Sequence, residues 1–114
     1  MPTPDAVRLR HMHEAVTLAL RISGGRNRPD LSTDPMLALA LTRCLEILGE
    51  AASKLSSDIR NQFPNIPWAN MVAMRNRLIH AYFDVDLDIV WATVSEDLPS
   101  LLPVIDCALA EIDR

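Results

Sequence analysis

The sequence has few of the residues that build β-sheets and tight turns. Of its 114 residues, five are aromatic and three are glycine. Strands favour aromatic and β-branched side chains, and hairpins favour glycine, so this composition disfavours a fold of many strands. The apolar residues make up 49% of the chain and are mainly Leu, Ala, Ile, Val and Met, a mixture that favours helices. A chain of this length buries roughly two-thirds of its unfolded surface, so we expect one all-α domain over residues 1–114.

The sequence also lacks long apolar runs and closely spaced cysteines. No run approaches the ~20 apolar residues that a membrane span needs, and the N-terminal residues have no apolar signal region. We therefore expect a cytoplasmic protein that is not secreted. Cys44 and Cys107 lie far apart, which favours buried thiols over a metal site. His11 and His13 diverge on a helix, so we expect surface histidines and neither a metal nor a cofactor.

Basic residues are scarce in the last third of the chain. The net charge is −4, which disfavours broad nonspecific binding of nucleic acid. From Leu78 to Asp113 there is no Lys or Arg, but there are eight acids: Asp84, Asp86, Asp88, Glu96, Asp97, Asp106, Glu111 and Asp113. Ten of the eleven basic residues are arginine, which suits both phosphate contacts and ion pairs. A local arginine patch for RNA and a basic partner for the acidic segment both stay open.

Apolar residues at helical spacing predict the first two long helices. The first runs from about Pro4 to Ile22, and we expect the polar segment from Gly24 to Thr33 to be a mobile loop. Asp34-Pro35 opens the second helix as N-cap and first-turn proline. Its core-facing seam recurs every three or four residues: Leu37, Leu41, Leu45, Leu48, Ala52 and Leu55. Leu39 and Ile47 lie off this seam, so the helix needs a second neighbour, which could be another subunit.

The second half of the chain predicts further helices, one short and two long. After a break with a single turn at about 58–63, a helix starts at Pro67, and Trp68 and Trp91 are more typical of a core than of base stacking. Asp86 can N-cap the last helix, which Pro99 and Pro103 should kink or split because each removes a backbone donor. The expected fold is a four- to five-helix up-and-down bundle.

The polar residues nearest the seam of the second long helix are Glu46 and Glu50. Spacing favours a solvated face for both, with Arg43 pairing to Glu46.

The segment RNRLIHAY gathers Arg75, Asn76, Arg77, His80 and Tyr82. Each helical residue turns by about 100°, so Tyr82 lies about 20° from Arg75, and His80 lies one turn after Asn76. If the helix ends near His80, its macrodipole favours a protonated imidazole. From spacing alone, such a group is most often a helix cap, an ion pair or a buried tyrosine.

The same residues also suit metal-independent cleavage of RNA. An imidazole can move protons, and a guanidinium can hold a phosphate and stabilise its extra negative charge. Asn76 could orient the imidazole or donate to a phosphate oxygen. In this reaction the 2′-hydroxyl attacks its own phosphodiester, which calls for both a base and an acid. One chain offers a single histidine here, and a two-fold dimer would supply both groups.

Several segments in order give the chain a resemblance to a known family. They are Leu45–Ala52 (LEILGEAA), Phe63–Trp68 (FPNIPW), Met74–Phe83 (MRNRLIHAYF), Val85–Trp91 (VDLDIVW) and Asp97–Pro99 (DLP). Together they resemble the HepT-like toxin family of the HEPN superfamily over nearly the whole chain.

This resemblance implies a HEPN-like helical bundle that forms a homodimer and acts as a metal-independent endoribonuclease. Arg75 and His80 would be the catalytic pair at a composite site in the dimer interface, with Asn76 in support. It also implies a toxin–antitoxin pair, in which a minimal nucleotidyltransferase transfers AMP to Tyr82. The added bulk and negative charge would compete with the RNA phosphate.

The route by which RNA approaches an acidic protein is a separate prediction. Arg77, Arg26 and Arg28 are candidates for RNA binding beside Arg75. The alternative function is a non-catalytic helical dimer that binds nucleotide or docks a nucleotidyltransferase. A third possibility is a plain structural dimer in which the cluster is only a polar network.

Overall fold

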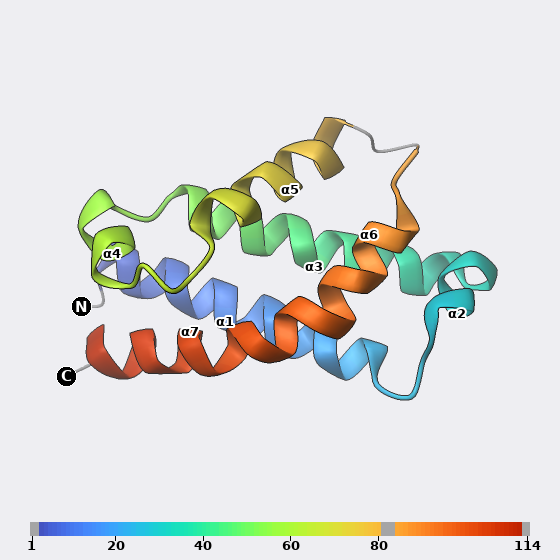
Figure 1. The fold of residues 1–114 in the computed structure, drawn as a ribbon, viewed down its shortest axis with the longest axis horizontal. Coiled ribbons are helices and arrows are strands. Elements are labelled where there is room, and N and C mark those ends of the chain that lie inside the picture. Colours follow the sequence, from blue (N-terminus) through green and yellow to red (C-terminus); the bar gives the residue numbers. More distant parts are fainter. Residues whose placement is uncertain (1–2, 81–83, 113–114) are drawn as a thin grey trace.

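The computed structural model describes residues 3–80 and 84–112, with the side chain of His80 outside that description. Over these residues the fold is all-α, as predicted. The elements are α1 (Pro4–Ser23), α2 (Arg28–Thr33), α3 (Pro35–Ser53), α4 (Ser57–Gln62), α5 (Trp68–His80), α6 (Leu87–Ala92), the π-helical turn η1 (Thr93–Asp97) and α7 (Leu98–Ile112). The long elements alternate in direction, and α7 returns alongside α1 (Figure 1). None of the helices in the described ranges combines the length and the apolar composition of a membrane span.

Polar side chains set the starts of the helices where the sequence predicted them. The side chain of Asp34 accepts from the Leu37 N–H at 3.2 Å, and Pro35 occupies the first turn of α3. Asp86 caps α6 by accepting from the N–H groups of Asp88 and Ile89. These side chains satisfy backbone donors that have no partner inside the helix. The prediction of both starts is confirmed.

The expectation of a mobile loop from Gly24 to Thr33 is wrong for its second half, which forms α2. The carboxylate of Asp30 accepts from the Asn27 N–H at 2.8 Å, and a proline lies in the first turn. Leu31 is 2% exposed and anchors the helix to the core. A first-turn proline and an N-terminal carboxylate both favour helix initiation, and the buried leucine stabilises a helix too short to be stable alone.

The predicted seam from Leu37 to Leu55 is buried along its whole length, although α3 itself ends at Ser53. It packs on α1, where Leu9, Met12 and Val16 are fully buried. The outer face of α3 differs, because Met36 and Leu39 are 80% and 69% exposed. The second neighbour that the sequence required for α3 is α5, which packs on it within the same chain, and Ile47 is partly buried against the core. Of the two off-seam residues in the prediction, Leu39 is the one that stays in water.

The final helical segment is divided before Pro99, as predicted, but α7 continues as one helix through Pro103, where the predicted split does not occur. The π-helical turn η1 separates α6 from α7 immediately before Pro99, and Pro103 lies inside α7. The ribbon changes direction along this segment (Figure 1). The hydroxyls of Thr93 and Ser95 donate to the carbonyls four residues earlier, at 2.8 and 2.7 Å. Such bonds compete with the backbone ladder and bend helices, so they assist the prolines in breaking the regular pattern.

The thiols and histidines follow their predictions in part. Cys44 is buried, and burial raises the pKa of its thiol. Cys107 is exposed, so the prediction of two buried thiols is wrong. Cys107 precedes the buried Ala108 but lies on the solvent side of α7. His11 is exposed, and the partly exposed imidazole of His13 lies 2.8 Å from a carboxylate oxygen of Asp106, linking α1 to α7.

The indoles have the core positions that were predicted. Trp68 is 8% exposed, and its N–H donates to the carbonyls of Arg60 and Phe63 at 3.2 and 3.1 Å. Trp91 is half-buried and packs against the core. Trp68 thus connects the α4 region to the first turn of α5, the helix that carries the polar cluster.

Candidate active site

Helix α5 places Arg75, Asn76 and His80 on one continuous segment of backbone. Its inner face is anchored by Trp68, Met71 and Leu78, which are 8%, 8% and 5% exposed. The helical rise of about 1.5 Å per residue puts the backbone positions of Arg75 and His80 about 7.5 Å apart along the axis. Burial of this face therefore fixes where the backbones of the polar residues lie.

Gly49 brings the backbone of α3 unusually close to α5. A Cβ at this position would overlap the Cβ of Arg75 and would lie 2.7 Å from the carbonyl oxygen of Met71. Both neighbours are held by helical backbone, so neither can move aside cheaply. The absence of a side chain at Gly49 thus sets how closely Arg75 approaches α3.

The guanidinium of Arg75 is held between two polar groups. Its Nη2 forms an ion pair with Glu50, and its Nη1 donates to the amide oxygen of Asn76 at 2.8 Å. The Arg75 side chain is 29% exposed, whereas its Nε is buried and has no hydrogen-bond partner among the described atoms. Arginine has five N–H donors, so the guanidinium keeps donors for a further anion.

The two glutamates of α3 differ in their contacts. Glu46 pairs with Arg43 at 3.2 Å, as predicted. Glu50 was expected on a solvated face, but it pairs with Arg75 and lies 3.7 Å from the Nζ of Lys54. Sequence spacing did not indicate the contact with Arg75, because it joins residues 25 positions apart. The neighbouring glycine was the available signal, since a glycine inside a helix often marks a close backbone approach.

The other polar residues of the RNRLIHAY segment differ in whether the structure describes their side chains. Asn76 and Arg77 are exposed on α5. Arg77 lines a hollow of about 90 Å³ together with Asp84 and Asp86. The side chains of His80 and Tyr82 lie outside the described residues. The shared ridge of Arg75 and Tyr82, and that of Asn76 and His80, stay predictions.

Arg26 and Arg28, expected to help bind RNA, lie near the start of α3. Arg26 pairs with Asp34 at 2.9 Å, and Arg28 pairs with Asp88 of α6 at 2.6 Å. The N–H of Leu37 and the guanidinium of Arg26 lower the pKa of the Asp34 carboxyl. Asp34 and Glu50 are separated by sixteen residues of helix, or about 24 Å. The structure thus pairs both arginines with acids at the other end of α3 from the Arg75 pair.

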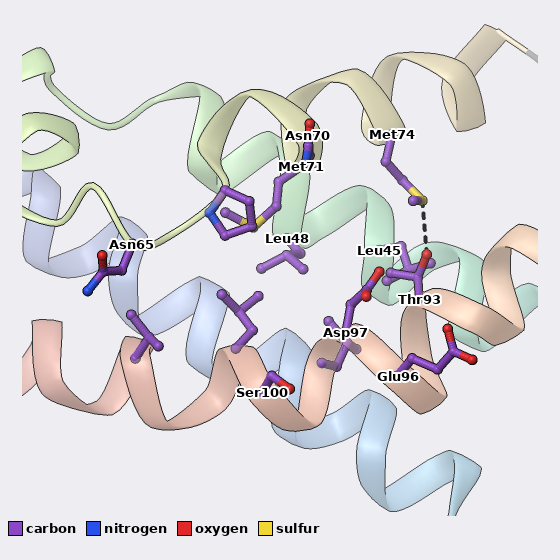
Figure 2. Close-up of a pocket in the computed structure, with 14 residues that line it drawn as sticks. Leu45, Leu48, Asn65, Asn70, Met71, Met74, Thr93, Glu96, Asp97 and Ser100 are labelled. Carbon is purple, nitrogen blue, oxygen red and sulfur yellow. Dashed lines mark hydrogen bonds between the residues drawn. The ribbon is translucent and has the colours of Figure 1, made fainter.

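A groove of about 320 Å³ lies between α5 and the η1–α7 segment (Figure 2). Its lining includes Leu48, Met71 and Leu101, and the hydroxyl of Thr93 lies 3.7 Å from the sulfur of Met74. On its η1 side are the exposed acids Glu96 and Asp97, and Asp97 points into the groove. Neither Arg75 nor Asn76 lines this groove. Over the described ranges, no group of three His, Cys, Asp or Glu side chains is placed to hold a metal ion.

Comparison with known proteins places the chain in a family. The family model described as "Ribonuclease HepT-like" matches residues 12–108. The chain belongs to the ribonuclease HepT-like family. The resemblance seen in its motifs is therefore confirmed.

Curated relatives support the same assignment. The chain is 36% identical over 101 residues to a candidate RNase of Caldanaerobacter subterraneus subsp. tengcongensis, with 89% of each chain covered. It is 47% identical over 72 residues to "Probable ribonuclease HepT" of Thermococcus cleftensis, covering 63% of this chain and 66% of the relative. A candidate RNase of Methanocaldococcus jannaschii is 47% identical over 66 residues, covering 58% of this chain and 61% of the relative. The chain thus spans just under two-thirds of the length of these last two relatives. No solved structure matches the chain.

Proposed function

We propose that this protein is a metal-independent endoribonuclease that acts as the toxin of a toxin–antitoxin pair. The observation that carries the proposal is the arrangement on α5, where the partly exposed guanidinium of Arg75 precedes His80 by five residues on one helix. Membership of the ribonuclease HepT-like family supports it, as do the printed names of the relatives.

Arg75 would hold the scissile phosphate. Its free donors allow it to bind phosphate oxygens while Glu50 and Asn76 keep the guanidinium in place. During the reaction the phosphorus becomes five-coordinate and gains negative charge, which a fixed cation stabilises more than it stabilises the starting diester. Asn76 would support this role by orienting Arg75.

His80 would move the protons. One imidazole takes the proton of the ribose 2′-hydroxyl, and the oxygen attacks the adjacent phosphorus. The bond from phosphorus to the 5′-oxygen breaks, and that oxygen receives a proton from a second, protonated imidazole. The products are a 2′,3′-cyclic phosphate and a free 5′-hydroxyl. Each chain offers one His80, so we propose that a single HEPN-like domain over residues 1–114 pairs as a two-fold homodimer that supplies both imidazoles.

Tyr82 would be the site at which activity is switched off. We propose that a minimal nucleotidyltransferase antitoxin transfers AMP to its hydroxyl. Tyr82 follows Arg75 by seven residues in the sequence. The added phosphate and nucleoside would occupy the position of the RNA and pair with Arg75.

Cleavage of RNA by the unmodified protein tests the activity. The protein is purified without a partner, intact mass confirms that Tyr82 is unmodified, and cellular RNA is added in excess EDTA. Wild type should produce fragments with 2′,3′-cyclic phosphate ends, whereas Arg75→Ala and His80→Ala should not. If both variants cleave RNA and arrest growth as wild type does, the proposed catalytic pair is wrong.

A second candidate function is a non-catalytic subunit that docks a nucleotidyltransferase. The groove between α5 and α7 favours it, because an apolar floor with acidic side chains at its edge suits a basic partner helix. Under this alternative, wild type would not cleave RNA, and a nucleotidyltransferase would bind His80→Ala as tightly as wild type. Reversing charge at Glu96 and Asp97 together would then weaken the complex.

A further inference from the structure

Helices α1 and α3 enclose a small hollow beside the Arg75–Glu50 pair. Its volume is about 110 Å³, and its lining includes Arg8 and His11 of α1 with Arg43 and Glu50 of α3. Arg8 and His11 are three residues apart, so they are neighbours on the surface of one helix. Glu50 lines the hollow and contacts Arg75. The hollow thus adjoins the guanidinium that the proposed reaction uses.

The hollow is basic within a chain of net charge −4. Neither Arg8 nor His11 forms an ion pair with another described residue. Arg43 is 69% exposed and uses one nitrogen on Glu46, which leaves donors of its guanidinium free. The negative charge of Glu50 is balanced by Arg75 and Lys54. By contrast, Arg26 and Arg28 are each paired with an acid.

We propose that this hollow binds a backbone phosphate of single-stranded RNA next to the cleaved one, with Arg8 and Arg43 as its principal ligands. The inference rests on the proposed function, because it assigns RNA to the adjoining site. The volume is several times the ~30 Å³ that one water occupies in the liquid, so one phosphate group fits. An arginine guanidinium matches two phosphate oxygens, and the His11 imidazole can donate a further hydrogen bond.

This placement has consequences for how RNA is selected. Contacts to phosphates fix the register of a strand but carry no sequence information. The hollow would therefore hold RNA in position for Arg75 without selecting bases. An acidic protein can bind RNA in this way because a few local cations act at distances shorter than the ~10 Å screening length at 0.1 M salt.

Salt-dependent binding of an uncleavable strand tests the inference. The probe is a fluorescein-labelled 2′-O-methyl RNA of mixed sequence, which has no 2′-hydroxyl to attack the phosphate. Its dissociation constant is measured between about 50 and 200 mM salt by anisotropy. Arg8→Gln should weaken binding about tenfold and reduce the log–log salt slope by about 0.7, the change for one phosphate on a single strand. Arg8→Lys should keep most of the slope.

Arg21→Gln is the matched control, because Arg21 is an exposed arginine at the other end of α1. It should bind the probe with the affinity and slope of wild type. The inference is overturned if Arg8→Gln and Arg43→Gln behave like Arg21→Gln. It is also overturned if light scattering shows that the two variants have an altered assembly and this change accounts for their whole loss of affinity. Failure of the proposed function looks different: wild type would bind the probe with the Arg8-dependent slope and leave ordinary RNA intact.

Discussion

The two sides of α5 are packed in opposite ways. On the α3 side, Gly49 leaves no room for a methyl group, and Arg75 is paired with Glu50. On the α7 side, the same helix borders a groove of about 320 Å³ with an apolar floor. Close packing transmits strain, and an open groove allows side chains to rearrange. The comparison indicates that α3 determines the position of Arg75, while the α7 side of the helix has room for side chains to move.

The largest expected effect is the loss of stability when either of two leucines of α3 is replaced by alanine. One of these leucines is closely packed on all sides, and the other lies beside the groove. Leu41→Ala should destabilise the fold by about 3–5 kcal/mol, because Leu41 is fully buried away from the groove. Leu48→Ala should cost about 2–3 kcal/mol, since Leu48 borders space that already exists. Urea unfolding of both variants measures the difference. Equal losses would show that the groove is filled in solution.

Gly49→Ala tests the tight side of α5. Alanine favours a helix over glycine by about 1 kcal/mol, but the added methyl overlaps Arg75, so we expect a net loss of about 1–3 kcal/mol. Gly24→Ala is the control, because the nearest atom to its added Cβ is 3.5 Å away, an ordinary contact. Thermal denaturation should show a lower unfolding midpoint for Gly49→Ala and an unchanged midpoint for Gly24→Ala. A midpoint at or above that of wild type would contradict the close approach of α3 and α5.

Glu50→Gln distinguishes an effect on the position of Arg75 from an effect on the stability of the fold. The carboxylate is 43% exposed, so loss of this ion pair should change the free energy of unfolding by about 1 kcal/mol or less. If Glu50 positions Arg75 for the proposed reaction, kcat should fall by about tenfold to a hundredfold while KM changes little. Glu46→Gln, one turn earlier, should keep the kcat of wild type. Equal kcat values in both variants would remove Glu50 from the proposed site.

The smallest expected effect is a change in the labelling rates of the two thiols, which report on the packing around α3. Cys107 is exposed and should react quickly with a maleimide at neutral pH. Burial raises the pKa of Cys44, so less reactive thiolate is present and access is blocked, and its labelling should be at least tenfold slower. Mass spectrometry after timed quenching measures both rates. In Gly49→Ala, the labelling of Cys44 should become faster and that of Cys107 should not change. An unchanged labelling rate for Cys44 would mean that the packing around α3 is not loosened.

Local sequence patterns predicted most of the helical fold. The caps at Asp34 and Asp86, the seam of α3 and the division before Pro99 each depend on residues within a few positions of one another. The missed α2 depends on burial of Leu31 against a distant part of the chain. The exposure of Cys107 likewise depends on which face of α7 meets its neighbours.

The candidate site was predictable in composition but not in contacts. The motif identified Arg75, Asn76, His80 and Tyr82 from residue types and order. The pair of Arg75 with Glu50 depends on two helices meeting at Gly49, which no local spacing specifies. The same reason explains why Arg26 and Arg28, close in sequence to a helix start, pair with Asp34 and Asp88.

The return of α7 alongside α1 affects how the chain folds as it is synthesised. Helix α1 is covered on one side by α3, but part of its apolar face packs against η1 and α7, which the ribosome makes after α1 and α3. Until Leu98–Ile112 has emerged, that face stays in contact with water or with chaperones. A nascent chain that stops before Leu98 would keep α1 and α3 paired while exposing residues that are fully buried in the finished fold. Such fragments would be prone to aggregate, because the buried face of α1 is covered only once α7 has been made.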